Sequence, residues 1–286
     1  MGSKRQKKTN NAPAPGFRHQ KKLGQNFLTD PEIVRGIAAA SGADRDTLVI
    51  EIGPGEGVLT EALSDLAGHV TAIELDERLL PILRVRLFNR DNIDIVQGDI
   101  LQTDLNTLIP ERLAAYGLSE ARIVGNLPYY ITTPILMKLL EENVPAGSVT
   151  VMVQKEVGER LAAAPGSRDA GAITYTVHYY CTVTPILEVG RECFTPAPKV
   201  DSVVVRLDRR DAPPVETADP DRMFRLIKTG FMQRRKTLLN ALSALPMYTR
   251  EDLTAALAAA GIDPSRRAES LTLQDFARLA DELTEA

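Results

Sequence analysis

The sequence predicts an α/β fold in which a doubly wound, mostly parallel sheet is followed by a small all-helical domain. Three observations carry this prediction. Short apolar segments alternate with helical segments through residues 31–163, which is typical of β-α-β units. Glycines occupy every second position directly after the first of these apolar segments. From Pro220 onward the periodic segments have the spacing of helices, and none has the spacing of a strand.

The composition is that of an ordinary globular protein. Hydrophobic residues make up 44% and charged residues 25% of the 286 residues, so the chain can bury a sizeable core. No apolar run approaches the roughly 20 residues that cross a bilayer, and we expect no membrane contact. Cys181 and Cys193 form neither a disulfide framework nor a metal-ligand pattern. We therefore expect a cytoplasmic protein with reduced thiols and no metal.

The chain before the first main strand divides into an arm, a lead-in and a helix. Residues 1–16 are polar, basic and interrupted by Asn, Pro and Gly, which predicts a disordered basic arm. Residues 17–28 are predicted to form an ordered lead-in whose Phe and Leu side chains dock on the body. Asp30 followed by Pro31 is typical of a helix start, and this helix is expected to end near Gly42.

Strands and helices then alternate. Apolar strands are predicted at residues 48–52, 70–75, 93–97, 122–125 and 149–153. Helices are predicted at residues 58–66, 76–88, 133–140 and 156–163. Strands separated by helices in this way are expected to be parallel, with their carboxyl ends at one edge of the sheet.

After the last of these helices the pattern changes. Residues 173–183 and 200–207 are longer, β-branched and joined by an irregular segment with several prolines. We expect them to form an antiparallel pair that closes one edge of the sheet. Residues 211–218 are rich in proline and acids, which suits a linker, and glycine and proline divide the following residues into about four short helices. The predicted domains are therefore 17–210 and 211–286.

The glycine-rich turn within residues 49–60 is the first indication of a ligand. An apolar strand leads into Gly53, Gly55 and Gly57, and a helix begins directly after them. Alternate glycines let a ligand approach the main chain, and the helix N-terminus offers it free N–H groups. A dinucleotide-dependent dehydrogenase has a similar turn, so the turn alone leaves that alternative open.

Three acids follow at successive strand ends. Glu51 lies at the end of the first strand, Glu74 ends the second and Asp99 follows the third. A carboxylate in the place of Glu74 can accept both hydroxyls of a ribose, and one in the place of Asp99 can accept the exocyclic amine of adenine. Each acid alone is about as well explained as a solvated strand-end carboxylate. As an ordered set they predict a nucleoside site across the carboxyl edge of the sheet.

The segment Asn126, Leu127, Pro128 and Tyr129 follows the fourth strand and indicates the chemistry. An exocyclic amine on an aromatic ring is a poor nucleophile, because its lone pair is delocalised into the ring. The side-chain oxygen of Asn126 and the carbonyl of Leu127 can accept its two N–H groups and favour the reactive pyramidal form. Pro128 stiffens the turn, and Tyr129 offers a face on which a flipped-out base can stack. A plain Asn-x-Pro turn is the structural alternative.

Basic residues gather in two places although the net charge is −4. One group lies within the first 22 residues. The other group suits a polyanionic partner, which the resemblance described below implies to be the phosphates of RNA; it is Arg225, Lys228, Arg234, Arg235 and Lys236. A solvated helix face is the alternative for this second group.

These motifs together resemble those of the ribosomal RNA small-subunit (16S rRNA) adenine N6-dimethyltransferases, from Lys22 to the C-terminal helices. The matching segments are KLGQNFL at 22–28, ExGxGxGxLT at 51–60, GD at 98–99, NLPY at 126–129, VQKE at 153–156, FxPxPKVDS at 194–202 and FxQRRKTL at 231–238. The resemblance implies a Rossmann-like class I methyltransferase that uses S-adenosyl-L-methionine. It also implies the transfer of two methyl groups to each of two adjacent adenosines, in a hairpin loop near the 3′ end of the small-subunit rRNA.

The resemblance further implies the residues of the site. Cofactor contacts are expected from Asn26, Leu28, Glu51, Gly53, Gly55, Glu74, Asp99, Ile100 and Asn126. Asn126 is expected between the cofactor and the target amine, and Phe194 opposite Tyr129 on the target base. A core position is the alternative for Phe194. The implied partner is 16S rRNA within the small ribosomal subunit or its precursor, and we expect the protein to act as a monomer.

Two further functions stay open at this point. A resistance-type methyltransferase of large-subunit rRNA shares the fold and the Asn-x-Pro-aromatic motif, although segments 194–202 and 231–238 favour the small-subunit family. The chain could also act chiefly as an assembly factor for the small subunit, with methylation as a secondary activity.

Overall fold

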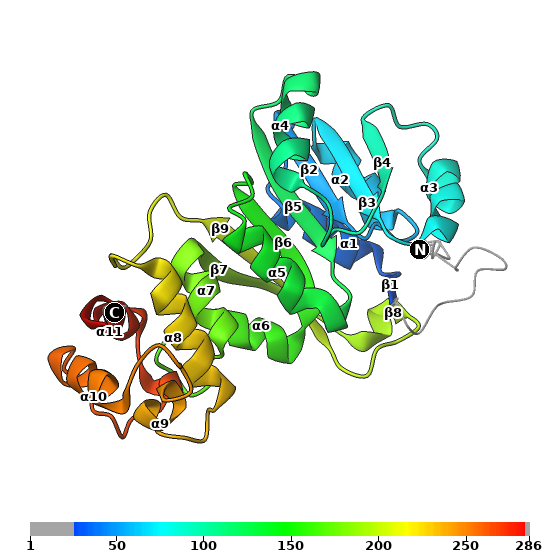
Figure 1. The fold of residues 1–286 in the computed structure, drawn as a ribbon. Coiled ribbons are helices and arrows are strands. Elements are labelled where there is room, and N and C mark those ends of the chain that lie inside the picture. Colours follow the sequence, from blue (N-terminus) through cyan, green and yellow to red (C-terminus); the bar gives the residue numbers. More distant parts are fainter. Residues whose placement is uncertain (1–25, 284–286) are drawn as a thin grey trace, which may run out of the picture.

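The structure is a computed structural model that describes residues 26–283. Its centre is a seven-stranded sheet with the order β4-β3-β2-β5-β6-β9-β7 (Figure 1). The strands are β2 (Thr47–Ile52), β3 (His69–Glu74), β4 (Ile93–Gln97), β5 (Glu120–Asn126), β6 (Ser148–Gln154), β7 (Cys181–Val189) and β9 (Ser202–Arg209). The predicted basic arm and most of the predicted lead-in lie outside the described residues.

The strands β2 to β6 are parallel, as the alternation of strands and helices predicts. The register brings the ends of β2, β3 and β5 together, since Ile52 pairs with both Ile73 and Gly125. The acids at the strand ends and Asn126 therefore lie along one edge of the sheet, where open α/β sheets bind their ligands.

Helices cover both faces of this sheet. The helices of the body are α1 (Pro31–Ala40), α2 (Val58–Leu66), α3 (Leu80–Arg86), α4 (Leu105–Tyr116), α5 (Thr132–Glu141), α6 (Lys155–Ala162) and α7 (Ala172–Tyr180). α1 and α2 pack on the face that carries Val49 and Val70, and α4 and α5 pack on the face that carries Leu48 and Ile50. Alternate residues of a strand point to opposite faces, and because helices cover both faces, β2 is buried at every position. Asp30 caps α1, as predicted.

A second, two-stranded sheet is not apparent from the sequence. β1 (Phe27–Leu28) runs antiparallel to β8 (Phe194–Thr195). Thr29 continues this contact, since its N–H donates to the carbonyl of Cys193 over 2.8 Å. The pair holds the last residues of the lead-in beside the carboxyl edge of the main sheet.

The antiparallel edge pair is present as β7 and β9, but the predicted strand at 173–183 is wrong over most of its length. Residues Ala172–Tyr180 form helix α7, and β7 begins only at Cys181. Tyr175 and Tyr179, one helical turn apart, are buried in the core of the C-terminal helices. Burying both rings on one side requires the period of a helix, and this packing outweighs the strand preference of the surrounding β-branched residues.

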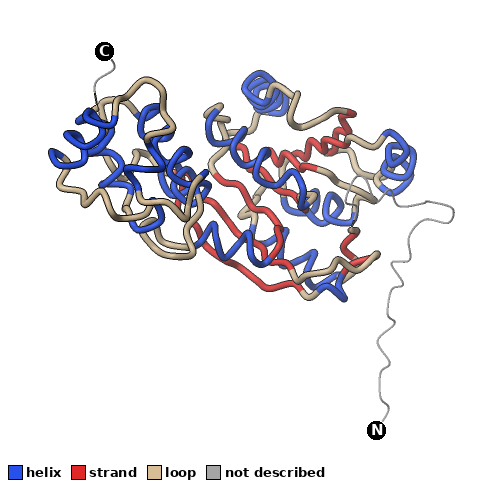
Figure 2. Tube along the Cα trace, turned by 60° about the horizontal axis from the view of Figure 1, so that its bottom comes forward, coloured by secondary structure: helices blue, strands red, loops and turns tan. Residues whose placement is uncertain are grey.

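The C-terminal part is all-helical, and Figures 1 and 2 show its helices gathered at one end of the molecule. They are α8 (Pro220–Met232), α9 (Leu238–Leu242), α10 (Arg250–Ala259) and α11 (Leu273–Glu282). Tyr175 of α7 joins their core, because its ring lies 5.4 Å from that of Phe276 and its hydroxyl donates to the carbonyl of Leu271 over 2.6 Å. Within residues 26–283 there is no helix whose length and apolar character would let it span a membrane.

Candidate active site

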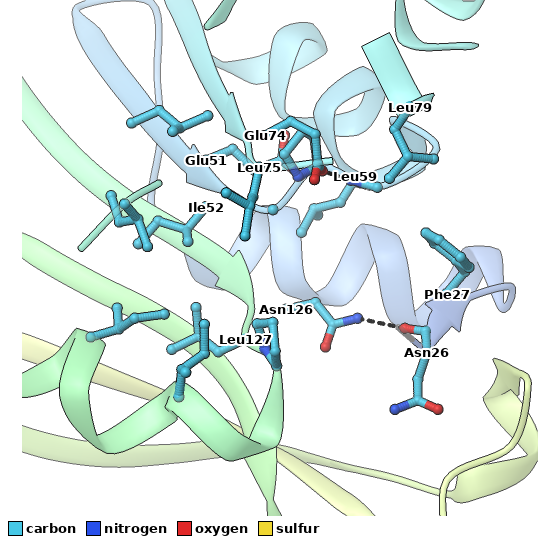
Figure 3. Close-up of a pocket in the computed structure, with 18 of the residues that line it drawn as sticks. Asn26, Phe27, Glu51, Ile52, Leu59, Glu74, Leu75, Leu79, Asn126 and Leu127 are labelled. Atoms are coloured by element: carbon cyan, nitrogen blue, oxygen red, sulfur yellow. Dashed lines mark hydrogen bonds between the residues drawn. The ribbon is translucent and has the colours of Figure 1, made fainter. Parts of the chain in front are cut away.

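A cavity lies at the carboxyl edge of the parallel strands (Figure 3). It contains all the expected cofactor residues and all the expected residues of the target site except Phe194. These lining residues are Asn26, Leu28, Glu51, Gly53, Gly55, Glu74, Asp99, Ile100, Asn126, Leu127, Pro128 and Tyr129. They come from the lead-in and from the ends of β2, β3, β4 and β5, so the parallel sheet is what brings them together.

The glycine turn forms one wall of the cavity. Gly53 and Gly55 have φ angles of 68° and 61°, in the left-handed region that glycine adopts most easily. A β-carbon on Gly53 would meet open space, so a ligand can approach the main chain there. A β-carbon on Gly55 would lie 2.9 Å from the ring of Phe27. The lead-in therefore packs directly on the turn.

Glu74 lies in the cavity wall at the end of β3. Its Oε2 accepts the N–H of Gly55 over 3.1 Å, and its Oε1 accepts the N–H of Asp76 over 2.8 Å. Burial raises the pKa of Glu74, and these two N–H groups oppose the rise. The two bonds fix the carboxylate beside the glycine turn, and its remaining lone pairs can accept hydroxyl donors.

Glu51 is the most buried acid of the cavity, with 1% of its surface exposed. Its Oε2 has no hydrogen-bond partner among the described residues. Burial raises the pKa of Glu51 to about 8, and the charge of Glu74 adds to the rise. A buried acceptor without a partner is costly, and an ammonium group bound in the cavity would supply the missing donor.

Asp99 and Ile100 line the cavity after the end of β4. Oδ1 of Asp99 accepts the N–H of Leu101 over 2.9 Å, which fixes the carboxylate. Ile100 is buried beside it. A carboxylate acceptor next to an apolar surface suits the exocyclic amine and the ring of an adenine.

The side-chain amide of Asn126 is held in one orientation. Its Nδ2 donates to the main-chain carbonyl of Asn26 over 3.0 Å, and Figure 3 shows Oδ1 turned away from that carbonyl. No described residue hydrogen-bonds to Oδ1. The next residue, Leu127, is buried, and its N–H donates to the carbonyl of Met152 on β6. The segment is thus tied to the lead-in on one side and to the sheet on the other.

Tyr129 begins the short helical turn η3 (Tyr129–Ile131) and lines the cavity. Its hydroxyl is hydrogen-bonded to the hydroxyl of Ser202 over 2.7 Å. Ser202 is fully buried at the start of β9. Burial raises the pKa of Tyr129. The ring is therefore anchored at its polar end and stays neutral at physiological pH.

Phe194 does not line the cavity. It pairs with Leu28 in the two-stranded sheet and has 4% of its surface exposed. It packs in the same core as Val34 and Val189. The structure therefore places Phe194 in the core, which is the alternative position considered for it, and Phe194 belongs to the strand that pairs with β1. Contact of Phe194 with a target base stays a prediction.

The expected RNA-docking cations are all exposed. They are Arg225 and Lys228 on α8, and Arg234, Arg235 and Lys236 directly after it. The guanidinium of Arg234 lies 5.7 Å from the centre of the Phe231 ring and donates to the carbonyl of Arg168 over 3.0 Å. Arg168 follows α6, so Arg234 connects the C-terminal helices to the body.

Sequence reasoning missed several residues that the structure brings to the site. Phe27, Leu75 and Leu79 line the cavity, and Ser202 holds Tyr129. The position of Leu75 directly after Glu74 is a signal that could have found it, because a residue next to an acid expected at a ligand site lies beside the same cavity. Among residues 26–283, no three His, Cys, Asp or Glu side chains gather as they would around a metal ion.

The fold and the cavity together define the class of protein, which is an α/β methyltransferase of class I with a nucleoside site at the carboxyl edge of its sheet. A sequence profile of the family described as ribosomal RNA adenine dimethylase matches residues 16–285. The chain belongs to this family, whose members use S-adenosylmethionine as the methyl donor.

Relatives with established names match over nearly the whole chain. A protein of Geobacillus thermodenitrificans, named ribosomal RNA small subunit methyltransferase A, is 48% identical over 271 residues, which cover 94% of this chain and 92% of that protein. A protein of the same name from Clostridium acetobutylicum is 45% identical over 267 residues, which cover 93% and 94% of the two chains.

Two solved structures share most of the fold. The dimethyladenosine transferase of Plasmodium falciparum superposes with a TM-score of 0.72 at 25% identity, covering 88% of this chain and 95% of its own. The 23S rRNA methyltransferase ErmE superposes with a TM-score of 0.66 at 29% identity, covering 90% and 99%. Because a 23S rRNA methyltransferase shares the fold, the fold alone does not decide which RNA is the substrate.

Proposed function

We propose that this chain transfers methyl groups from S-adenosylmethionine to N6 of adenosines in the 16S rRNA of the small ribosomal subunit or its precursor. Two methyl groups go to each of two adjacent adenosines in a hairpin loop near the 3′ end. The observation that carries the proposal is the Asn126 amide, whose Nδ2 is held by Asn26 while its Oδ1, at the cavity, has no partner among residues 26–283. The names of relatives at 48% and 45% identity support the small-subunit RNA.

The cavity residues fit S-adenosylmethionine. The unpartnered Oε2 of Glu51 and the open turn at Gly53 suit its methionine end, Glu74 suits the ribose, and Asp99 with Ile100 suits the adenine. When bound, S-adenosylmethionine supplies a methyl group on a sulfonium, which is already electrophilic. The protein therefore has to hold it, align it and exclude water.

The lead-in closes one side of the cavity. Asn26, Phe27 and Leu28 line it, and the pairing of β1 with β8 holds them there. Phe27 packs on the glycine turn, since its ring lies next to the position that a β-carbon of Gly55 would occupy. These side chains, which are largely apolar, keep water away from the reacting atoms.

The Asn126 segment prepares the target amine. Oδ1 of Asn126 and the carbonyl of Leu127 each accept one N–H of the adenine amine, which directs the nitrogen lone pair toward the methyl group. Tyr129 stacks on the flipped-out base. The amine proton becomes acidic once the nitrogen is alkylated and leaves to solvent afterwards. No general base is needed, and we assign none.

The C-terminal residues 211–286 form the proposed docking domain for RNA. The exposed cations on and after α8 bind phosphates, which position the RNA and do not read its sequence. We expect the protein to act in the cytoplasm as a monomer and without a metal.

The fold shared with ErmE makes a large-subunit rRNA the second candidate substrate. The assembly-factor alternative predicts that Asn126→Ala loses methylation but supports subunit assembly as well as the wild-type chain does. If that variant instead impairs assembly as deletion of the protein does, methylation and assembly are one function.

The test is methylation of purified small and large subunits that lack the modification, with labelled S-adenosylmethionine and primer extension on each RNA. We expect label only in the small-subunit RNA, at two adjacent adenosines. Label only in the large-subunit RNA would overturn the proposal. Asn126→Ala is the control, and it should lose at least about 100-fold in rate while calorimetry still shows S-adenosylmethionine binding. Binding of a nicotinamide dinucleotide instead would support a dehydrogenase.

A further inference from the structure

The side-chain amide of Asn126 can face the cavity in two ways. Its NH₂ end donates hydrogen bonds and its oxygen end accepts them, although the two ends have nearly the same size. An adenine amine offers N–H donors, so only the orientation that presents Oδ1 is productive. In the flipped orientation two donors would meet. The side chain itself does not choose between these orientations.

The structure assigns that choice to the main-chain carbonyl of Asn26, and we propose that this carbonyl is a positioning group for the methyl transfer. It lies 3.0 Å from Nδ2 of Asn126, 100 residues away along the chain. A carbonyl oxygen only accepts hydrogen bonds. Flipping the amide would place Oδ1 against this oxygen and lose a hydrogen bond. The inference rests on the methyl transfer proposed above.

No competing contact holds the amide the other way. Among residues 26–283, none hydrogen-bonds to Oδ1 of Asn126. Figure 3 shows Oδ1 on the side of the amide that is turned away from Asn26. The oxygen is thus available to a donor that enters the cavity, and among the residues that the structure describes only the carbonyl of Asn26 hydrogen-bonds to the side-chain amide.

The carbonyl of Asn26 is itself fixed by the lead-in. It directly precedes β1, which pairs with β8. Thr29 extends the pairing, because its N–H and its hydroxyl both donate to the carbonyl of Cys193, over 2.8 Å and 3.0 Å. Docking of β1 therefore completes the cavity wall and orients the amide of Asn126 in the same step.

The decisive variant is Asn126→Asp, which replaces the donor end of the amide by an acceptor. At high pH the ionised carboxylate has no hydrogen for Asn26, and the facing oxygens repel, which raises the pKa of the new carboxyl. When protonated, the carboxyl donates its O–H to Asn26 and presents its carbonyl oxygen to the target amine. We expect the activity relative to wild type to rise about tenfold for each unit by which the pH is lowered from about 8 to about 6.

How the relative activity of Asn126→Asp depends on pH tells whether the Asn26 carbonyl takes part. If the Asn26 carbonyl played no part, the carboxylate would accept the amine N–H groups directly, and its relative activity would stay constant or fall as the pH is lowered. Either result overturns the inference. Asn126→Ala is the matched control, because it has neither donor nor acceptor and its ratio to wild type should not depend on pH. Wild-type activity on the same small subunits tests the proposed function separately.

A second variant leaves the Asn126 side chain intact. Replacement of Phe27 by its α-hydroxy analogue makes the link after Asn26 an ester, whose carbonyl is a weaker acceptor. The same replacement at Thr29 is the matched control, since it removes an N–H that donates to the carbonyl of Cys193, directly before β8, but leaves the Asn26 carbonyl unchanged. We expect kcat to fall about threefold more for the ester at Phe27. Equal losses at both positions would contradict the inference.

Discussion

The hydroxyl groups of Tyr129 and Ser202 are joined by a hydrogen bond of 2.7 Å, which connects the cavity to the start of β9. Ser202 is fully buried, so it is a fixed point in the sheet. The bond anchors the polar end of the Tyr129 ring, so the ring on which we propose that the target base stacks is held in place before a base arrives.

Removing this bond should lower kcat/KM for the RNA about fivefold, since a buried hydrogen bond contributes about 1 kcal/mol. Tyr129→Phe and Ser202→Ala should each show this loss, and the double variant should lose no more than either single variant. Tyr129→Ala should lose about 10- to 100-fold, because it also removes the stacking surface. Steady-state kinetics on small subunits measures all four, and additive single losses would contradict the shared role.

Glu51→Gln should change how stability depends on pH. The pKa of Glu51 is raised from 4.5 to about 8, so the folded protein keeps a proton that the unfolded chain has lost. The stability from this group is complete below about pH 4.5 and is lost as the pH rises through about 8. The Tm of the variant minus the Tm of the wild type should therefore increase from about pH 5 to about pH 8, because only the wild type loses stability by this titration. Thermal unfolding without ligand measures it, with the exposed Glu77→Gln as control.

Binding of S-adenosylmethionine at about neutral pH should release a proton. Glu51 is largely protonated in the free protein at this pH, because burial raises its pKa to about 8, and a bound ammonium group favours the ionised carboxylate. Calorimetry in two buffers with different ionisation enthalpies counts the released protons. Glu51→Gln should bind more weakly and release none, whereas an unchanged count would show that the ammonium group lies elsewhere.

The cations after α8 should determine how RNA binding depends on salt. Replacing Arg235 and Lys236 together by Ala should weaken binding and lower the slope of log K against log salt by about 1.4 to 1.8, which is about 0.7 to 0.9 for each lost phosphate contact. Arg267→Ala, also exposed in the helical part, should leave the slope unchanged. Filter binding over a range of salt concentrations gives both slopes, and calorimetry should show unaltered cofactor binding.

Tyr175→Phe should destabilise the protein by about 1 to 3 kcal/mol. The hydroxyl donates to the carbonyl of Leu271 and accepts the N–H of Gly166, and both groups would be left without this partner. Burial raises the pKa of Tyr175 to about 12, which reflects the same enclosed position. Denaturant unfolding measures the change. Tyr130→Phe is the control, since Tyr130 is 56% exposed and should have little effect.

The cavity could be predicted from the sequence because its residues belong to a few short segments with strong local signals. Glu51 and Glu74 lie at the ends of two apolar strands and Asp99 follows a third, and parallel strands bring their carboxyl ends to one edge. Because of that rule, a residue at the carboxyl end of a predicted strand can be placed at the cavity from its position in the sequence.

The tertiary pairs could not be predicted. Tyr129 meets Ser202 across 73 residues, and Asn126 meets Asn26 across 100, so no local pattern indicates either contact. The helix α7 was missed because its β-branched residues favour a strand, and only the C-terminal core makes a helix preferable. The helix α4 was not predicted, because Pro110 lies in its interior and its apolar residues are only weakly gathered on one side.

The packing of Tyr175 has a consequence for the proposed docking of RNA. It belongs to the body through α7, yet its ring and hydroxyl are packed among the C-terminal helices. The helices that carry the cations after α8 are thus packed against the body through a residue of α7. If these cations bind RNA phosphates as proposed, the packing sets how far the bound phosphates lie from Asn126. We then expect the choice of nucleotide to depend on the shape of the folded RNA, with no reading of base sequence at the docking surface.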